Sequence, residues 1–137
     1  MIFILALAFV SVVTSHQVDV TDCLDGKGKI IVNFANVEPW PIERNKNASV
    51  TLSYTIVQQV EEAECTQTIY KGKLPLRKDT YSICDLTPCP LMPGNQTATR
   101  DIEVPNVVPP GDYRGEDKCH NRNKVDICCG SYNITVV

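Results

Sequence analysis

The amino-acid sequence predicts an all-β protein, an antiparallel β-sandwich of about seven short strands in one domain. Three observations carry this prediction. Apolar and polar residues alternate with period two in several segments, as in a strand with one buried face. Clusters of Gly, Pro, Asp and Asn separate these segments, and no helical period of useful length lies between them. The length of 137 residues suits a single domain.

The first residues predict export from the cytosol. Residues 1–13 are almost unbroken apolar, and a helix of that length reaches about 20 Å, short of the roughly 30 Å hydrocarbon core of a bilayer. The small residues Thr14 and Ser15 follow, so we expect a signal peptide over residues 1–15 and a mature domain over residues 16–137. Sequons for N-glycosylation at Asn47, Asn95 and Asn133 agree with a secreted protein or one of the lysosomal lumen.

The strands follow in order along the mature chain. Weak alternation predicts strands at residues 18–23 and 29–34, and the clearest strand lies at residues 50–56, with its inward side chains at Val50, Leu52, Tyr54 and Ile56. Residues 66–76 and 97–104 predict two more, the second with Ala98, Ile102 and Val104 inward. In the last strand, residues 131–136, Asn133 points outward and the inward set is Tyr132, Ile134 and Val136.

Residues 112–124 are rich in charge. The charged side chains leave only Tyr113, Gly115 and Cys119 for an inner face. An exposed edge strand and an irregular loop both fit this composition.

Seven cysteines leave at least one unpaired in a monomer. Cys84 and Cys89 predict a local clip, and a bond from Cys23 to Cys128 or Cys129 would join the two ends of the domain. A third bond could join Cys65 to Cys119, with Cys119–Cys128 as the competing pair. The Cys119-His120 and Cys128-Cys129 pairs lack CxxC spacing, and an oxidising compartment favours disulfides over zinc, so we expect no metal site.

The sequence carries no recognisable catalytic constellation. His16 and His120 are its only histidines, and it lacks a Gly-x-Ser-x-Gly turn, a phosphate loop and a dinucleotide fingerprint. A net charge of −3 also argues against a nucleic-acid partner. We therefore expect neither an enzyme nor a cofactor.

Several segments together resemble the ML lipid-recognition family, which includes the Niemann–Pick type C luminal sterol carriers and the group 2 mite allergens. The most specific is the clip at residues 84–91, Cys-Asp-Leu-Thr-Pro-Cys-Pro-Leu, and the others lie at residues 18–23, 38–44, 49–54 and 109–113. The resemblance implies an immunoglobulin-like sandwich whose sheets splay apart around an apolar lipid pocket. It also implies a bond from Cys23 to the last strand. In the family, the residues at odd offsets after that last-strand cysteine point inward. Counting from Cys129 makes Tyr132, Ile134 and Val136 inward, which matches the apolar set, so the resemblance favours Cys129 over Cys128 as the partner.

The chain departs from the family in its penultimate strand. Arg114, Glu116 and Lys118 stand where the family has aliphatic pocket walls. We therefore expect a pocket that is shallower, more polar at its mouth or bounded by another strand.

The favoured function is a carrier that shields one hydrophobic molecule, a sterol, fatty acid or phospholipid, from water. Burying ten methylenes is worth on the order of 8 kcal/mol before association costs. We expect a monomer that also contacts a membrane or receptor transiently. The alternative is an immunoglobulin-like protein-recognition module with a packed core. Residues 105–110 could line the entrance or act as a stiff connector, and the full set of pocket candidates is Val50, Leu52, Tyr54, Ile56, Ile69, Leu74, Leu76, Ile102, Val104, Val107, Tyr113, Tyr132 and Ile134.

Overall fold

A computed structural model describes residues 14–137 of the chain. Residues 1–13, which form most of the expected signal peptide, lie outside the described residues. Among residues 14–137, no helix is long and apolar enough to cross a bilayer.

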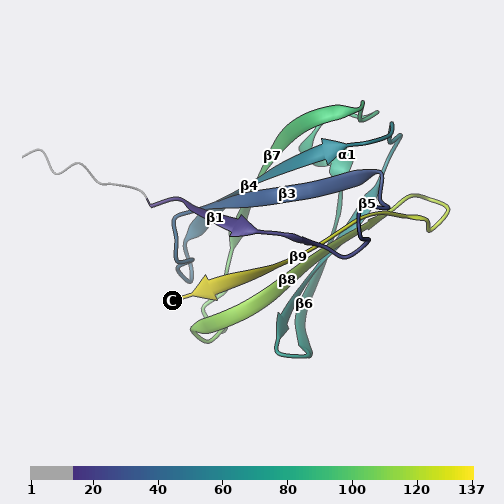
Figure 1. The fold of residues 1–137 in the computed structure, drawn as a ribbon. Coiled ribbons are helices and arrows are strands. Elements are labelled where there is room, and N and C mark those ends of the chain that lie inside the picture. Colours follow the sequence, from purple (N-terminus) through teal and green to yellow (C-terminus); the bar gives the residue numbers. More distant parts are fainter. Residues whose placement is uncertain (1–13) are drawn as a thin grey trace, which may run out of the picture.

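Two antiparallel sheets face each other and form a sandwich (Figure 1). The four-stranded sheet has the order β1 (His16–Asp19), β3 (Ile30–Glu38), β4 (Asn47–Ile56) and β7 (Gly94–Glu103). The five-stranded sheet has the order β2 (Thr21–Asp22), β9 (Asp126–Val136), β8 (Gly111–His120), β5 (Glu64–Lys71) and β6 (Leu74–Ser82). A short helix, α1 (Ile83–Leu86), follows β6. The predicted all-β sandwich is confirmed.

The described residues contain nine strands, whereas the sequence predicts about seven. The difference arises because two segments predicted as single strands each form two. The segment 18–23 breaks at Val20, where the chain leaves the four-stranded sheet as β1 and joins the five-stranded sheet as β2. The segment 66–76 is not one strand but a hairpin, because Gly72 adopts a positive φ of 61° and turns β5 back into β6. The predicted orientation of the last strand is confirmed, with Asn133 exposed and Ile134 and Val136 buried.

The charged segment 112–124 is neither an edge strand nor a loop over most of its length. Its first residues form β8, which pairs with β9 on one side and β5 on the other. The charges at alternate positions lie on the outer face, where the Arg114 guanidinium bonds the Glu116 carboxylate at 3.2 Å and stacks over the Tyr70 ring. The charges of β8 are therefore compatible with a central strand, because only its opposite face points between the sheets.

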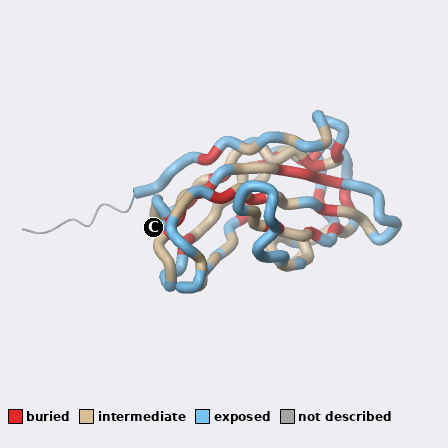
Figure 2. Tube along the Cα trace, turned by 90° about the horizontal axis from the view of Figure 1, so that it is seen from below, coloured by how far each residue is buried: buried red, intermediate tan, exposed pale blue. Residues whose placement is uncertain are grey.

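The interior divides into two apolar clusters, and the tube in Figure 2 shows the buried residues along the strands. One cluster closes the end of the sandwich next to α1 and includes Ile30, Ile56, Leu91 and Ile127. The other lies toward the opposite end and includes Val37, Ile42, Tyr113 and Val136.

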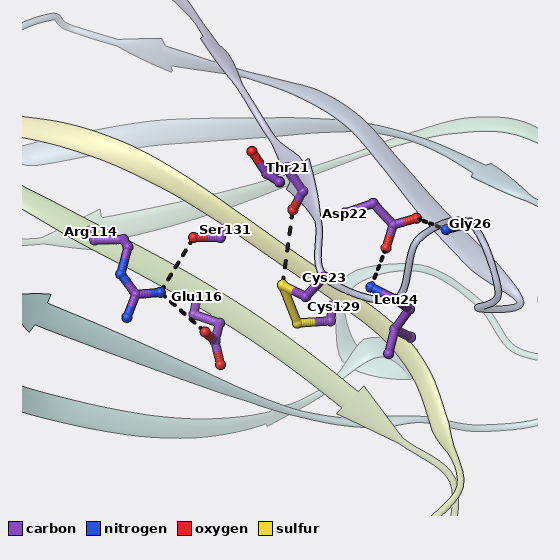
Figure 3. Close-up of a disulfide and its surroundings, with 9 residues drawn as sticks. All are labelled: Thr21, Asp22, Cys23, Leu24, Gly26, Arg114, Glu116, Cys129 and Ser131. Carbon is purple, nitrogen blue, oxygen red and sulfur yellow. Dashed lines mark hydrogen bonds and ion pairs between the residues drawn. A yellow bond between two sulfur atoms is a disulfide. The ribbon is translucent and has the colours of Figure 1, made fainter. Parts of the chain in front are cut away.

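The structure contains the predicted clip Cys84–Cys89 and joins Cys23 to Cys129, as the family resemblance implies. Of the two pairings left open for Cys119, it has the one with Cys65. Figure 3 shows the Cys23–Cys129 bond, which ties β2 and its following turn to β9. Within residues 14–137, Cys128 is the one cysteine outside a disulfide. Burial raises the pKa of its thiol to about 12, so it stays protonated and is a poor nucleophile at neutral pH.

Candidate functional site

A cavity of about 360 Å³ lies between the two sheets. Side chains of β1, β3, β4 and β7 form its wall on one side, and those of β5, β6, β8 and β9 form the other. Its apolar lining includes Val37, Val50, Ile69, Ile102 and Ile134. Pockets that hold small ligands typically measure about 300–1,000 Å³ and are lined mostly by apolar side chains. The cavity has the size and the lining to enclose a lipid tail.

The structure brings most of the pocket candidates together around this cavity. Tyr54 instead lines a second, smaller cavity of about 40 Å³ toward α1. Ile56 is buried in the cluster beside α1, and Leu74 is 62% exposed next to the β5–β6 turn. The candidates that line the larger cavity are Val50, Leu52, Ile69, Leu76, Ile102, Val104, Val107, Tyr113, Tyr132 and Ile134.

The segment 105–110 lies at the rim of the larger cavity. Val107 is 88% exposed and Val108 is half-buried, and both line the cavity together with the exposed Leu76 of β6. Apolar side chains that face both solvent and a cavity suit an entrance for a hydrophobic molecule. Of the two interpretations left open by the sequence, this placement favours the entrance.

Polar side chains gather where the two cavities meet, and we call them the inner polar cluster: Gln67, Tyr81, Arg100, Asp117 and Tyr132. The Tyr132 hydroxyl donates to Asp117 Oδ2 at 2.8 Å, and the Tyr81 hydroxyl donates to Asp117 Oδ1 at 3.1 Å. Gln67 Nε2 donates to the Tyr132 hydroxyl oxygen at 2.9 Å. Tyr81, Asp117 and Tyr132 line both cavities. The cluster is therefore a shared polar wall between them.

Gly115 allows this arrangement. It faces Tyr132 across the β8–β9 pair, and a Cβ atom built on it would overlap the Tyr132 ring. Because glycine has no side chain, the ring can lie against β8 and place its hydroxyl on Asp117, two residues along the same strand.

Burial controls the protonation of the cluster. Desolvation raises the pKa of the Asp117 carboxyl above its ordinary value, although the hydrogen bonds from Tyr132 and Tyr81 and the charge of Arg100 lower it. Desolvation and the neighbouring carboxylate raise the pKa of Tyr81 and Tyr132 as well, so both phenols remain hydrogen-bond donors at neutral pH.

The raised pKa of Asp117 predicts a pH-dependent stability. The folded state binds this proton more tightly than the unfolded chain does, so the free energy of unfolding falls as the pH rises from about 4 through the folded-state pKa. Asp117→Asn removes the titration. We measure the free energy of unfolding of both proteins by urea titration from about pH 4 to about pH 8. We expect the difference, variant minus parent, to become more positive as the pH rises. A difference that stays constant with pH would contradict a raised pKa.

The sequence analysis did not identify the inner polar cluster, although the signal was available. Arg100 lies between Ala98 and Ile102, which were both predicted to point inward, and Asp117 lies between Gly115 and Cys119 in the same way. Strict alternation places both charged residues between the sheets. The prediction that Arg114, Glu116 and Lys118 stand at the pocket wall is wrong, since these alternate positions of β8 face outward and do not line the cavity. The charged side chain of β8 that lines it is Asp117.

The comparison with known families decides the identity of the fold. A family model described as an ML domain matches residues 17–136. The chain belongs to the ML domain family. The resemblance drawn from its sequence segments is confirmed.

Relatives of this ML domain include lipid carriers of fungi. It is 27% identical over 114 residues to a phosphatidylglycerol/phosphatidylinositol transfer protein of Aspergillus oryzae, covering 78% of this chain and 65% of the relative. It is 30% identical over 100 residues to the protein of that name in Candida albicans, covering 68% of this chain and 52% of the relative. The match thus spans between half and two thirds of the length of these relatives.

Two solved structures share the fold. A Niemann-Pick type C2 protein from the Japanese carpenter ant superposes with a TM-score of 0.65 at 16% identity, covering 85% of this chain and 98% of that one. Chicken MD-1 complexed with lipid IVa superposes with a TM-score of 0.55 at 10% identity, covering 90% of this chain and 97% of that one.

Proposed function

We propose that this ML domain protein binds one lipid molecule in the cavity between its sheets and carries it through water. The observation that carries the proposal is the cavity itself, which has about 360 Å³ of space behind apolar walls. Each methylene that moves from water into such walls contributes about 0.8 kcal/mol, so a sterol, a fatty acid or a phospholipid tail gains enough to be held. The names of the fungal relatives and the lipid IVa in chicken MD-1 support this class of ligand.

The alternative function, a protein-recognition module, requires a packed core. The cavity is a specific observation against it, since apolar side chains such as Val50 and Ile102 are only partly buried although they point between the sheets. We also propose that the ligand leaves unchanged, because the sequence carries no nucleophile motif and both fungal relatives are named as transfer proteins.

We propose further that the protein is exported, with residues 1–15 as its signal peptide, and works outside the cell or in the lysosomal lumen. The disulfides fit an oxidising compartment. Asn47, Asn95 and Asn133 are all exposed, so a glycan at any of the three sequons would extend into solvent.

Lipid extraction tests the carrier function. We expect mass spectrometry of protein purified from a secreting host to find about one lipid molecule per chain, because an apolar cavity of this size gains from being filled. Delipidated protein should reload from phosphatidylcholine vesicles that contain cholesterol and oleic acid. Protein that is purified without lipid and then takes up none from such vesicles would refute the proposal.

A further inference from the structure

Arg100 has a position that the carrier function alone does not explain. It lies on β7, the last strand of the four-stranded sheet, and its guanidinium Cζ lies 4.4 Å from the ring centroid of Tyr81 on β6, the last strand of the five-stranded sheet. Neither strand has a further partner on this side in the described residues. Arg100 therefore spans the open edge of the sandwich and reaches the inner polar cluster.

The hydrogen bonds of the inner polar cluster leave one nitrogen of the Arg100 guanidinium unpaired. Tyr81 and Tyr132 each donate to a different oxygen of Asp117, and Gln67 donates to Tyr132. Arg100 Nη1 is buried and has no hydrogen-bond partner among residues 14–137. A buried donor without an acceptor is destabilising, more so when it is charged. The free protein thus keeps an unpaired cationic donor at the wall of an apolar cavity.

We propose that Arg100 binds an oxygen atom of the lipid, carried by a carboxylate or a hydroxyl group that enters between the sheets. The inference rests on the carrier function proposed above and adds a polar contact to it. A guanidinium has donors only, so its complement must be an acceptor. The cavity is lined largely by apolar side chains, among them Leu52, Ile69 and Ile102. These side chains offer no acceptor, and an oxygen atom of the ligand supplies one.

The other members of the cluster keep this donor available. The Asp117 carboxylate accepts a hydrogen bond from a tyrosine on each of its oxygens and none from Arg100 Nη1. The Tyr81 ring supports the cationic group from one face without using its N–H bonds. Arg100 is thereby positioned by the cluster while its Nη1 remains unpaired.

A competition between ligands with the same tail isolates this contact. Delipidated protein is incubated with phosphatidylcholine vesicles that hold equal amounts of stearic acid, stearyl alcohol and octadecane, and the bound ligands are quantified by mass spectrometry. The variants are Arg100→Met, which keeps the apolar stem, and Arg114→Met as a matched control. Arg114 lies on the outer face of β8, away from the cavity lining, where its guanidinium bonds the Glu116 carboxylate at 3.2 Å. Taking the ratio of oxygenated ligand to octadecane for each protein cancels the contribution of the tail and of the vesicle.

We expect Arg100→Met to lower the ratio for the acid, the alcohol or both by about tenfold, the usual scale of a hydrogen bond to a charged group. The ratio that falls identifies the group that Arg100 binds, while Arg114→Met should keep the parent ratios. Equal ratios in the parent protein and Arg100→Met, or an equal fall in Arg114→Met, would overturn the inference and leave the carrier function standing. If none of the three ligands loads, the carrier function fails, and the inference fails with it.

A second measurement on the unsubstituted protein guards against a misfolded variant. Octadecane loading already reports an intact cavity in Arg100→Met. If Arg100→Met no longer loads octadecane, the contact is tested in the parent protein by NMR, through the resonances of the Arg100 side-chain N–H groups. Stearic acid or stearyl alcohol should shift them and octadecane should not, whereas an equal shift with all three ligands would overturn the inference.

Discussion

Replacing Leu52 with tryptophan is expected to abolish lipid loading while the protein stays folded. Leu52 lies on β4 and lines both cavities. Its neighbours on the two adjacent strands of the four-stranded sheet are Ala35 and Ala98, so only small side chains flank it on the inner face. An indole at this position has space only in the cavity, and it would fill the volume that the lipid needs. The measurement is the number of lipid molecules bound per chain after exposure to vesicles.

The control for this variant is Thr51→Trp, which adds a similar bulk one residue away. Thr51 points to the opposite face, where its hydroxyl lies 3.0 Å from that of Thr99, so this variant should load lipid normally. Thermal unfolding of both variants separates a filled cavity from a damaged fold. Normal loading by Leu52→Trp would show that the lipid binds elsewhere, and loss of the folded state would show that Leu52 is a packed core residue.

Alternation in the sequence predicted the sandwich because it reports directly which face of a strand is buried. It predicted Val50, Leu52, Ile102 and Ile134 as inward residues, and these line the cavity. Alternation cannot report whether two inward faces touch, since a side chain on a filled interior and one on a hollow interior obey the same pattern. The volume between the sheets depends on how far they splay, which is a property of the assembled fold.

Alternation reports the inward positions of the charged side chains in the inner polar cluster but not their partners. Arg100 and Asp117 fall on inward positions by strict parity, but a charged side chain between two sheets is expensive unless it has partners. The partners, Tyr81 and Tyr132, come from strands far apart in the sequence. No local pattern joins them, so the inner polar cluster became visible only in three dimensions.

The sequence leaves the partner of Cys119 open for a related reason. In the sheet, Cys119 lies opposite Cys65 on β5 and opposite Cys128 on β9. Both alternatives considered from the sequence therefore place two cysteines on adjacent strands at the same level. The structure joins Cys65 to Cys119 and leaves Cys128 buried as a thiol, a distinction that spacing along the chain does not encode.

Removing the Cys23–Cys129 disulfide is expected to cause the largest loss of stability among single-bond removals. The two cysteines are 106 residues apart, and the chain-entropy model gives about 4–5 kcal/mol for closing a loop of that length in the unfolded chain. Denaturant unfolding of Cys23→Ser/Cys129→Ser under non-reducing conditions measures the loss. The matched control is Cys84→Ser/Cys89→Ser, whose bond spans 5 residues and should contribute only about 2 kcal/mol in the same model.

The position of this bond gives the loss a structural consequence. β1 belongs to one sheet and β2 to the other, so the chain around Val20 links the two sheets on the side away from β6 and β7. The disulfide of Cys23 anchors that link to β9 just after β2 (Figure 3), and the Cys23 backbone N–H also donates to the Cys129 carbonyl at 3.0 Å. The bond therefore holds one side of the sandwich closed while the other side remains open around Arg100. Equal losses in the two double variants would contradict this assignment, because a bond that only restrained local geometry would not depend on the length of the loop it closes.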